Sequence, residues 1–407
     1  MVSAVLAGTR WTTRIIPLIL AGYIGLVTYV MIKRICVDFF LHHRQQSRTA
    51  IIFLVFYSVL LLLLLVTYSR LWLVVQINPG VVPLGPRAIL QRERDVSGKR
   101  RRRSDGGEED LEASRYDRWP DENPDSPGLE AFYSKDVFVC TNDGRPRWCS
   151  TCCNWKPDRA HHCSELDRCV KKMDHYCPWV GGVVGETSFK YFVQFTFYAA
   201  LYYVVVVAAA GLCMRVTLAN GEPLDGFVIA ILAVSAFFAI FAFAMTCTAI
   251  RYICVNLTNV DYVKSKLGVY QLAIRVPRGT EDGFNYGVIS YPLSPEPGSS
   301  PDLSGQTFTN NEPSSRDHLA TRTFAIVKTE VGQNPWDMGY YRNWKSVMGS
   351  NAIDWLLPLR KSPCENEETS ESFYKMGPLL QTLRTRFDLP DIPLDEKKED
   401  TIKRVRK

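Results

Sequence analysis

The sequence has no strong net charge, no internal repeat and no even distribution of apolar residues. Its 48 Lys and Arg residues against 42 Asp and Glu residues leave a formal charge of +6, which indicates only a weak attraction to anionic surfaces. The mean hydropathy is close to zero because almost wholly apolar stretches alternate with charged or Pro- and Ser-rich ones. This segregation excludes a uniform soluble globular protein.

Four apolar runs are each long enough to cross a bilayer, which takes roughly 20 helical residues. They cover residues 15–32, 51–75, 191–214 and 227–250. One such run could equally be a buried core helix, but four in one chain favour an integral membrane protein. The first run lacks a following small-residue cleavage site, so we interpret it as a retained helix rather than a signal peptide.

Four spans place the N-terminus, the long middle segment and the C-terminal region on one side of the membrane. Basic residues follow the second span, precede the third and follow the fourth, as expected for the cytosolic side. The link between the last two spans carries only Arg215. The link between the first two spans disagrees, because it contains Lys33, Arg34, Arg44 and Arg48. We expect a multi-pass protein of an endomembrane or plasma membrane whose cysteine-rich segment faces the cytosol, where thiolates persist.

The composition predicts five regions along the chain. The first is an N-terminus with two membrane helices (1–77), and a largely disordered cytosolic linker follows (78–130). A cysteine-rich domain (131–188) and two further membrane helices (189–252) come next. The last is a cytosolic C-terminal region (253–407) with a disordered segment near 294–317. Residues 91–127 combine a basic run with an acidic, Pro-containing stretch that cannot bury enough apolar surface to fold. The basic run is either a solvated linker or a contact to anionic headgroups.

Half of the 12 cysteines lie in one short hydrophilic segment, at positions 149, 152, 153, 163, 169 and 177. The pair Cys149-x-x-Cys152 suits tetrahedral zinc, and a histidine and a cysteine downstream can complete four ligands. Redox-active or disulfide-bonded cysteines are the alternative interpretation. The segment lacks a second Cys/His pair at zinc-finger spacing and lies between membrane helices, so we expect no nucleic-acid partner.

Asp174, His175 and Cys177 form a second pattern. A free cysteine has a pKa of about 8.5, so few thiols are ionised at neutral pH. A nearby imidazole lowers that pKa or takes the proton, and a carboxylate holds the imidazole in the useful tautomer. The pattern is typical of covalent acyl transfer, although the same residues could also form a further metal site.

The segment resembles the cysteine-rich domain of the DHHC palmitoyltransferases, in the DHYC spelling that points to a fungal subgroup. Inside the segment the resemblance rests on Cys149 and Cys152 and on four further motifs, which are Lys156-Pro157-x-Arg159, His161-His162-Cys163-Ser164, Arg168-Cys169-Val170 and Asp174-His175-Tyr176-Cys177-Pro178-Trp179. Outside it, three family landmarks recur as Asn78-Pro79-Gly80, Thr258-Asn259-Val260-Asp261 and Asn334-Pro335-Trp336-Asp337. The resemblance covers the four spans and their cytosolic connections but not the two linkers.

The resemblance implies an α-helical integral membrane protein with four transmembrane helices and a small zinc-binding domain in the cytosolic loop between helices 2 and 3. It implies Asp174, His175 and Cys177 as the catalytic set, with Cys177 accepting a palmitoyl or other long-chain fatty acyl group from acyl-CoA as a thioester. A cysteine of a membrane-associated protein would then receive the acyl group. The expected partners are therefore fatty acyl-CoA, such protein substrates and the lipid bilayer.

The resemblance also implies a first zinc site made by Cys149, Cys152, His162 and Cys169, all of which are present. A second site would need Cys163 together with three positions that cannot bind zinc here, Leu166, Tyr176 and Val183. Family asparagines are replaced by Gly181, Gly182 and Thr187. We expect one structural zinc ion, with the three replaced ligands forming an apolar plug.

These losses leave an alternative function open, that of a catalytically weak zinc-binding membrane scaffold of the same family. The retained Asp-His-Cys set argues against it. A channel or transporter is disfavoured because the spans contain few ionisable residues.

Overall fold

The structure is a computed structural model that describes residues 2–102, 128–267, 269–291, 321–393 and 395–396. The predicted disordered segment near 294–317, most of the acidic part of the first linker and nearly all of the charged tail lie outside these residues.

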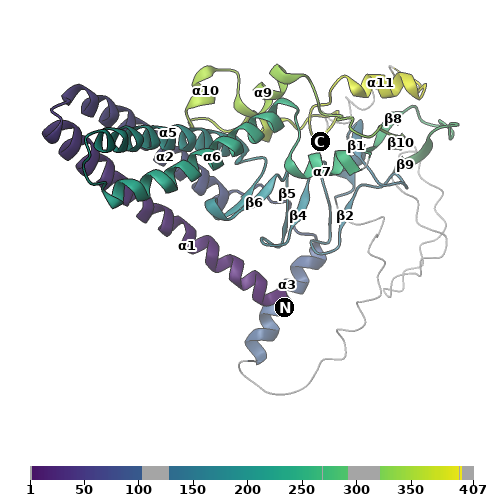
Figure 1. The fold of residues 1–407 in the computed structure, drawn as a ribbon. Helices are drawn as coiled ribbons and strands as arrows, with labels where there is room; N and C mark the ends of the chain where they lie inside the picture. Colours follow the sequence, from purple (N-terminus) through teal and green to yellow (C-terminus); the bar gives the residue numbers. More distant parts are fainter. Residues whose placement is uncertain (1, 103–127, 268, 292–320, 394, 397–407) are drawn as a thin grey trace.

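Four long helices form the membrane bundle (Figure 1). They are α1 (Val2–Tyr29), continued by the π-helix η1 (Val30–His43), α2 (Ser47–Ile77), α5 (Phe189–Ala219) and α6 (Gly226–Cys254). All four are long and apolar enough to cross a membrane. Half of the apolar window of α5 is buried inside the protein, against 17 to 22% in the other three, so α5 is the central helix and the others present most of their apolar surface outward.

The first membrane helix is longer than the sequence predicted, because it continues past residue 32 to His43. Arg34 therefore lies on the helix, where it contacts Asp225 at 3.0 Å, and Arg44 just beyond it contacts Glu222 at 2.8 Å. Both acidic residues belong to the link between α5 and α6. Cations that seemed to violate the charge rule are thus paired with carboxylates at the same end of the bundle.

Helix α3 (Pro86–Arg102) occupies part of the linker that was expected to be largely disordered. Its first residue is a proline, whose fixed φ favours a helix start. Arg92 donates to the backbone carbonyl of Asp167 at 2.8 Å and to its carboxylate at 2.7 Å. This contact ties α3 to the cysteine-rich segment, a tertiary interaction that local composition does not encode.

The cysteine-rich segment consists of three antiparallel two-stranded ladders, β2 (Trp148–Cys149) with β3 (Asn154–Trp155), β4 (His161–Cys163) with β5 (Arg168–Val170), and β6 (His175–Cys177) with β7 (Gly182–Val184). A short 3-10 turn, η3 (Pro178–Val180), joins the last two strands. Strands of two or three residues cannot bury a core of their own. The segment must therefore be held by its neighbours and by its own side-chain clusters.

The protein also contains a four-stranded antiparallel sheet, which the sequence analysis did not predict. Its order is β1 (Val137–Val139), β8 (Gln271–Val276), β10 (Arg322–Lys328), β9 (Gly287–Tyr291). Alternate residues of β8 pack into two different apolar clusters, Leu272 and Ile274 in one and Ala273 in the other. Both faces of the sheet are therefore covered, and β1 joins the chain before the cysteine-rich segment to the C-terminal region.

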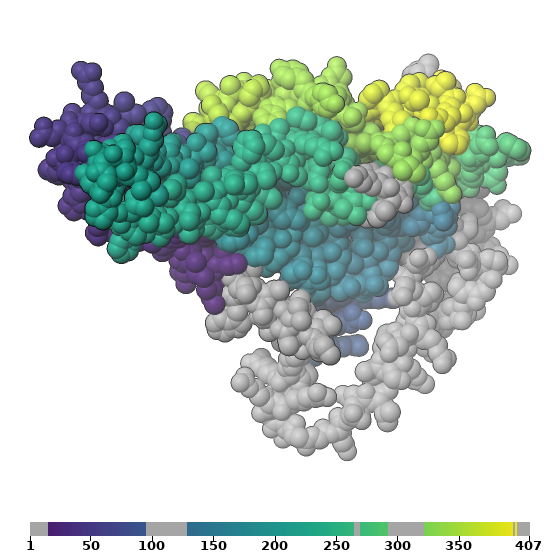
Figure 2. Space-filling view, viewed as in Figure 1, coloured from purple at the N-terminus to yellow at the C-terminus, as the bar shows by residue number. Residues whose placement is uncertain are grey.

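A short helix, α4 (Glu130–Tyr133), precedes β1. Further short helices complete the C-terminal region: α7 (Asn259–Leu267), α9 (Tyr340–Met348), α10 (Ala352–Leu356), η4 (Pro363–Asn366) and α11 (Leu379–Arg386). Figure 2 shows the residues from α9 to α11, in yellow-green and yellow, along one side of the molecule. Gln194 of α5 donates to the carbonyls of Asp354 and Trp355, at 3.0 and 3.1 Å. The C-terminal region is thus docked on the central membrane helix.

Candidate active site and metal centre

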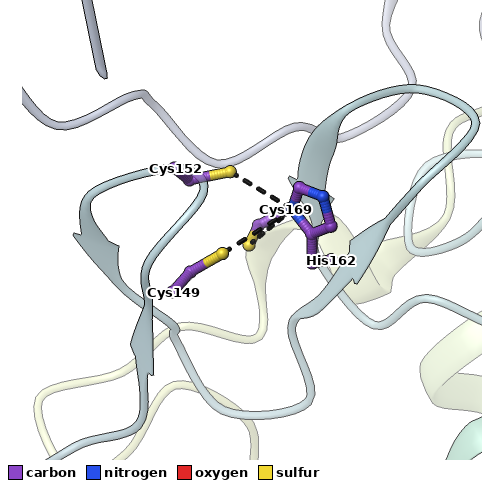
Figure 3. A group of neighbouring side chains, drawn as sticks. All are labelled: Cys149, Cys152, His162 and Cys169. Carbon is purple, nitrogen blue, oxygen red and sulfur yellow. Dashed lines mark hydrogen bonds between the residues drawn. The ribbon is translucent and has the colours of Figure 1, made fainter. Parts of the chain in front are cut away.

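Four side chains of the first predicted zinc site converge in the structure (Figure 3). The β2–β3 turn carries Cys149 and Cys152, and the β4–β5 ladder places His162 opposite Cys169. The ligand atoms all lie within 4.8 Å of one another. The Nδ1 atom of His162 is 3.4 to 4.0 Å from the three sulfurs, close to the edge of about 3.6 Å expected for tetrahedral zinc with three sulfur ligands and one nitrogen ligand.

The surroundings of this cluster also fit a metal ion. The other ring nitrogen of His162, Nε2, lies 3.8 Å from the carboxylate of Asp167, which is near enough for a small movement to give the hydrogen bond that orients metal-bound histidines. The three cysteines are buried, and burial raises the pKa of the Cys152 thiol. Buried thiolates need a cation nearby, so the residues present fit a divalent ion. Cys153 lies outside this cluster, and its Sγ donates to the carbonyl of Ser150.

The position of the second zinc site of the family, where we expected an apolar plug and no ion, is largely apolar. Cys163 and Val183 are each 1% exposed and pack with Val170, while Tyr176 lies against them. Burial raises the pKa of the Cys163 thiol to about 11, so this cysteine is a protonated thiol at neutral pH. Leu166 does not belong to the expected plug. It is 36% exposed, because it lies in the turn that joins β4 to β5.

The predicted reactive residues lie along β6: Asp174 precedes the strand, His175 begins it and Cys177 ends it. The Nδ1 atom of His175 is 2.6 Å from Oδ2 of Asp174, and Oδ1 of Asp174 accepts a hydrogen bond from the backbone N–H of Asn259 at 2.8 Å. The carboxylate is thus fixed by the first residue of α7. The His175 ring packs edge-on against Phe192 of α5, with ring centroids 5.2 Å apart.

These contacts set the protonation behaviour of His175. Burial alone would lower its pKa, but Asp174 and the Cys177 thiol together raise it to about 9. Because Nδ1 is directed at the carboxylate, Nε2 is the nitrogen left for other chemistry. It is buried, and among the described residues it has no hydrogen-bond partner.

Cys177 lines an apolar cavity of about 260 Å³ that extends among the four membrane helices. Its walls include Leu64 of α2, Phe195 and Ala199 of α5, and Phe238 of α6. The opposite strand of the hairpin is closely packed, since a Cβ added to Gly182 would lie 2.5 Å from a methyl group of Val75 on α2. The thiol is therefore held at one end of a hydrophobic chamber.

A buried arginine, Arg159, joins the cysteine-rich segment to the residues after α6. Its side chain is fully buried and donates twice to Oδ2 of Asp261, at 2.7 and 2.9 Å. It also donates to Oδ1 and the backbone carbonyl of Asn256, at 2.9 and 3.0 Å. Its guanidinium carbon lies 4.8 Å from the ring centroid of Trp336. The residues of three separated motifs thus meet at one point.

The C-terminal Asn-Pro-Trp block caps the end of α6. Asn334 donates to the carbonyl of Val255 at 2.7 Å, and Asn343 donates to the carbonyl of Cys254 at 2.8 Å. These amides satisfy carbonyls that the helix end leaves unpaired. The block therefore fixes the chain that leads from α6 to the Asn259 amide and so to Asp174.

Comparison with known proteins agrees with this architecture. Residues 142–266 match the model of the DHHC palmitoyltransferase family. The chain is 37% identical to palmitoyltransferase pfa5 of Aspergillus fumigatus over 93% of its own length and 90% of the relative's. It belongs to the DHHC palmitoyltransferase family. The corresponding protein of Emericella nidulans is also 37% identical, over 92% of this chain and 86% of its own. Palmitoyltransferase PFA3 of Saccharomyces cerevisiae is 29% identical over 62% of this chain.

The family and the fold predicted from the sequence are confirmed. The protein is a multi-pass membrane protein of a fungal DHHC-type family, with a Cys/His cluster able to hold a metal ion between its second and third membrane helices. The sequence analysis missed the role of Arg159 and the backbone contact of Asn259. Both residues stood in recognised motifs, but only the fold shows that these motifs contact one another.

Proposed function

We propose that this chain is a protein-cysteine S-acyltransferase that moves a palmitoyl or similar fatty acyl group from acyl-CoA to cysteines of membrane-associated proteins. The position of Cys177 carries the proposal. Cys177 interacts with the imidazole of the His175–Asp174 pair and lines a hydrophobic chamber inside the membrane bundle. A reactive thiol at the end of an apolar cavity suits a substrate with a thioester head and a hydrocarbon tail.

In the first half-reaction, Nε2 of His175 takes the proton of the Cys177 thiol. The resulting thiolate attacks the thioester carbonyl of acyl-CoA, the acyl–sulfur bond to CoA breaks, and the CoA sulfur leaves with the proton held on His175. Asp174 keeps Nδ1 protonated and stabilises the imidazolium. The same carboxylate contact, which helps to raise the pKa of His175 to about 9, stabilises the imidazolium that forms when the proton is taken.

In the second half-reaction, His175 takes the proton of the acceptor thiol, which attacks the acyl group on Cys177. The acyl–sulfur bond to Cys177 breaks, and Cys177 recovers a proton from His175. Both steps exchange one thioester for another, so the enzyme mainly supplies an activated thiol and a fixed position for the acyl chain.

We further propose that Cys149, Cys152, His162 and Cys169 hold one zinc ion, which would brace the two ladders that precede β6. The site would face the cytosol, where acyl-CoA and reduced thiols are found. The basic residues on the connecting segments support this orientation.

Acylation of purified protein tests the function. An alkyne-tagged palmitoyl-CoA should label the wild-type chain, hydroxylamine should release the label, and an added acceptor should receive it. Cys177→Ala should abolish labelling, whereas Cys153→Ala, which removes a nearby cysteine outside the metal cluster, should keep it. A chain that keeps its fold and binds zinc but is never labelled would be a scaffold.

A further inference from the structure

A second hollow lies beside the acyl cavity, on the other side of the β6–β7 hairpin. It is a groove of about 820 Å³ bounded by the start of the membrane-spanning part of α1, the end of α2 and the turns of the cysteine-rich segment. Pro17 and Tyr68 line both the groove and the acyl cavity. The hydroxyl of Tyr68 donates to the carbonyl of Trp179 at 3.3 Å, so this tyrosine forms part of the wall between them.

The groove lies where this chain departs from its family. Five of its lining positions are substituted family positions, namely Leu166, Tyr176, Gly181, Gly182 and Val183. In the β6–β7 ladder, Tyr176 pairs with Val183 and Cys177 pairs with Gly182. Four of these residues thus share a hairpin with the reactive thiol, and all five line the groove beside it.

The charge of the groove limits what it can bind. Glu165 is the only charged side chain among the described residues that line it. The carboxylate is held by hydrogen bonds from the Cys163 thiol and the Ser164 hydroxyl, at 3.2 and 3.0 Å. The phosphates of CoA would be repelled here, whereas a cationic group would be attracted. Exposed apolar surface from Leu18, Trp72 and Leu166 completes the lining.

We propose that this groove binds the segment of the acceptor protein that flanks its acceptor cysteine, with apolar residues against Leu166 and Trp72 and a basic residue beside Glu165. This inference rests on the proposed function. The acyl chain and the acceptor would then approach Cys177 from opposite sides of one hairpin, which keeps the two substrates from competing for one space. Acceptor cysteines flanked by Lys or Arg and bulky apolar residues are the class that fits.

Peptide binding tests the groove without depending on catalysis. Two fluorescent peptides are anchored in the same vesicles by one acyl chain, each with Ser in place of the acceptor Cys, and they differ only in Lys or Asp at the flanking positions. The wild-type protein should bind the Lys peptide at least about fivefold more tightly than the Asp peptide. Glu165→Lys should reverse this preference. The matched control Glu281→Lys, at an exposed site beyond β8, should keep it.

Transfer to the same peptides with the cysteine restored gives the second measurement. The Glu165→Lys protein should acylate the Asp peptide faster than the Lys peptide, relative to its own rate of Cys177 loading. Equal affinity for both peptides, or a preference that Glu165→Lys leaves intact, would overturn the groove assignment. Selective peptide binding by a chain that never loads Cys177 would support the groove and reject the proposed acyltransferase function, so the two failures are distinguishable.

Discussion

Replacing Arg159 by methionine should destabilise the protein and slow its chemistry together. The guanidinium is fully buried, and the carboxylate of Asp261 beside it is 2% exposed. Removing one partner leaves a buried carboxylate without compensation, which typically costs about 3–5 kcal/mol. The cavity term is small because methionine keeps most of the side-chain volume.

The effect on chemistry follows from the turn that Asp261 holds. Its carboxylate accepts the backbone N–H of Thr258 at 3.2 Å, and the next residue, Asn259, supplies the N–H that fixes Asp174. If Asp261 moves or becomes protonated, Asp174 loses a partner and His175 loses its fixed orientation. We therefore expect a slower rate of Cys177 acylation even at temperatures where the Arg159→Met variant is folded.

The assay combines denaturant unfolding in detergent with the rate of labelling by tagged palmitoyl-CoA. Asp261→Asn removes the charge but keeps an acceptor, so the double variant should be less destabilised than the sum of the single variants, by about 1–3 kcal/mol. Arg360→Met, at a side chain that is 72% exposed, serves as the control and should change stability by less than about 0.5 kcal/mol. Additive effects of the Arg159 and Asp261 substitutions would refute the reasoning.

Three further predictions follow from the site. Metal analysis of the purified protein should find one zinc ion per chain, and Cys169→Ser should lower both zinc content and thermal stability; two ions per chain would contradict the single-site assignment. Ala199→Phe should fill part of the acyl cavity and shift loading of Cys177 toward shorter acyl-CoA chains, which a series of acyl-CoA lengths measures. An unchanged length preference would mean that the acyl group does not occupy this cavity. Because the pKa of His175 is raised to about 9 from 6.5, its contribution to stability is complete below about pH 6.5 and is lost as the pH rises through about 9. Wild-type stability should therefore fall over this range more steeply than that of Asp174→Asn, and parallel pH profiles would count against the ion pair.

The sequence predicted what depends on periodic or local patterns. The four spans are visible because a bilayer requires about 20 consecutive apolar residues, whatever their neighbours. The metal cluster was predictable because Cys149 and Cys152 are close in sequence and the family pattern supplies His162 and Cys169. The family pattern alone indicates His162 rather than its neighbour His161 as the ligand. The structure agrees, because the pairing of β4 with β5 places His162 opposite Cys169 in the cluster.

Interactions between distant segments could not be predicted in this way. The sheet pairs β1 with β8, which lie on opposite sides of two membrane helices in the sequence, and no local signal marks three residues such as Val137–Val139 as its edge. The helix α3 and the exposure of Leu166 are of the same kind. Each depends on a tertiary neighbour or on the position of a turn, which composition does not specify.

A chain that holds one zinc ion, as we propose here, must stabilise its cysteine-rich segment by other contacts where a second ion would otherwise act. A structural zinc ion contributes about 10–16 kcal/mol to small domains, whereas burying a valine contributes about 1.5–3 kcal/mol. The apolar contacts of Val183 with Cys163 and Val170 therefore replace only part of what a metal would supply. The remainder must come from outside the cysteine-rich segment.

Several contacts from outside hold the ladder that carries Cys177, and two of them flank it closely. One is the close packing of Gly182 against Val75 on α2, and the other is the hydrogen bond from Asn259 to Asp174. Both partners adjoin membrane helices, so the reactive hairpin is braced by the bundle rather than by a second metal. A chain built in this way can leave the face beside Leu166 and Tyr176 open, because that face no longer has to enclose an ion. Leu166 and Tyr176 thus line the groove next to the hairpin of the thiol, where we propose that the acceptor protein binds.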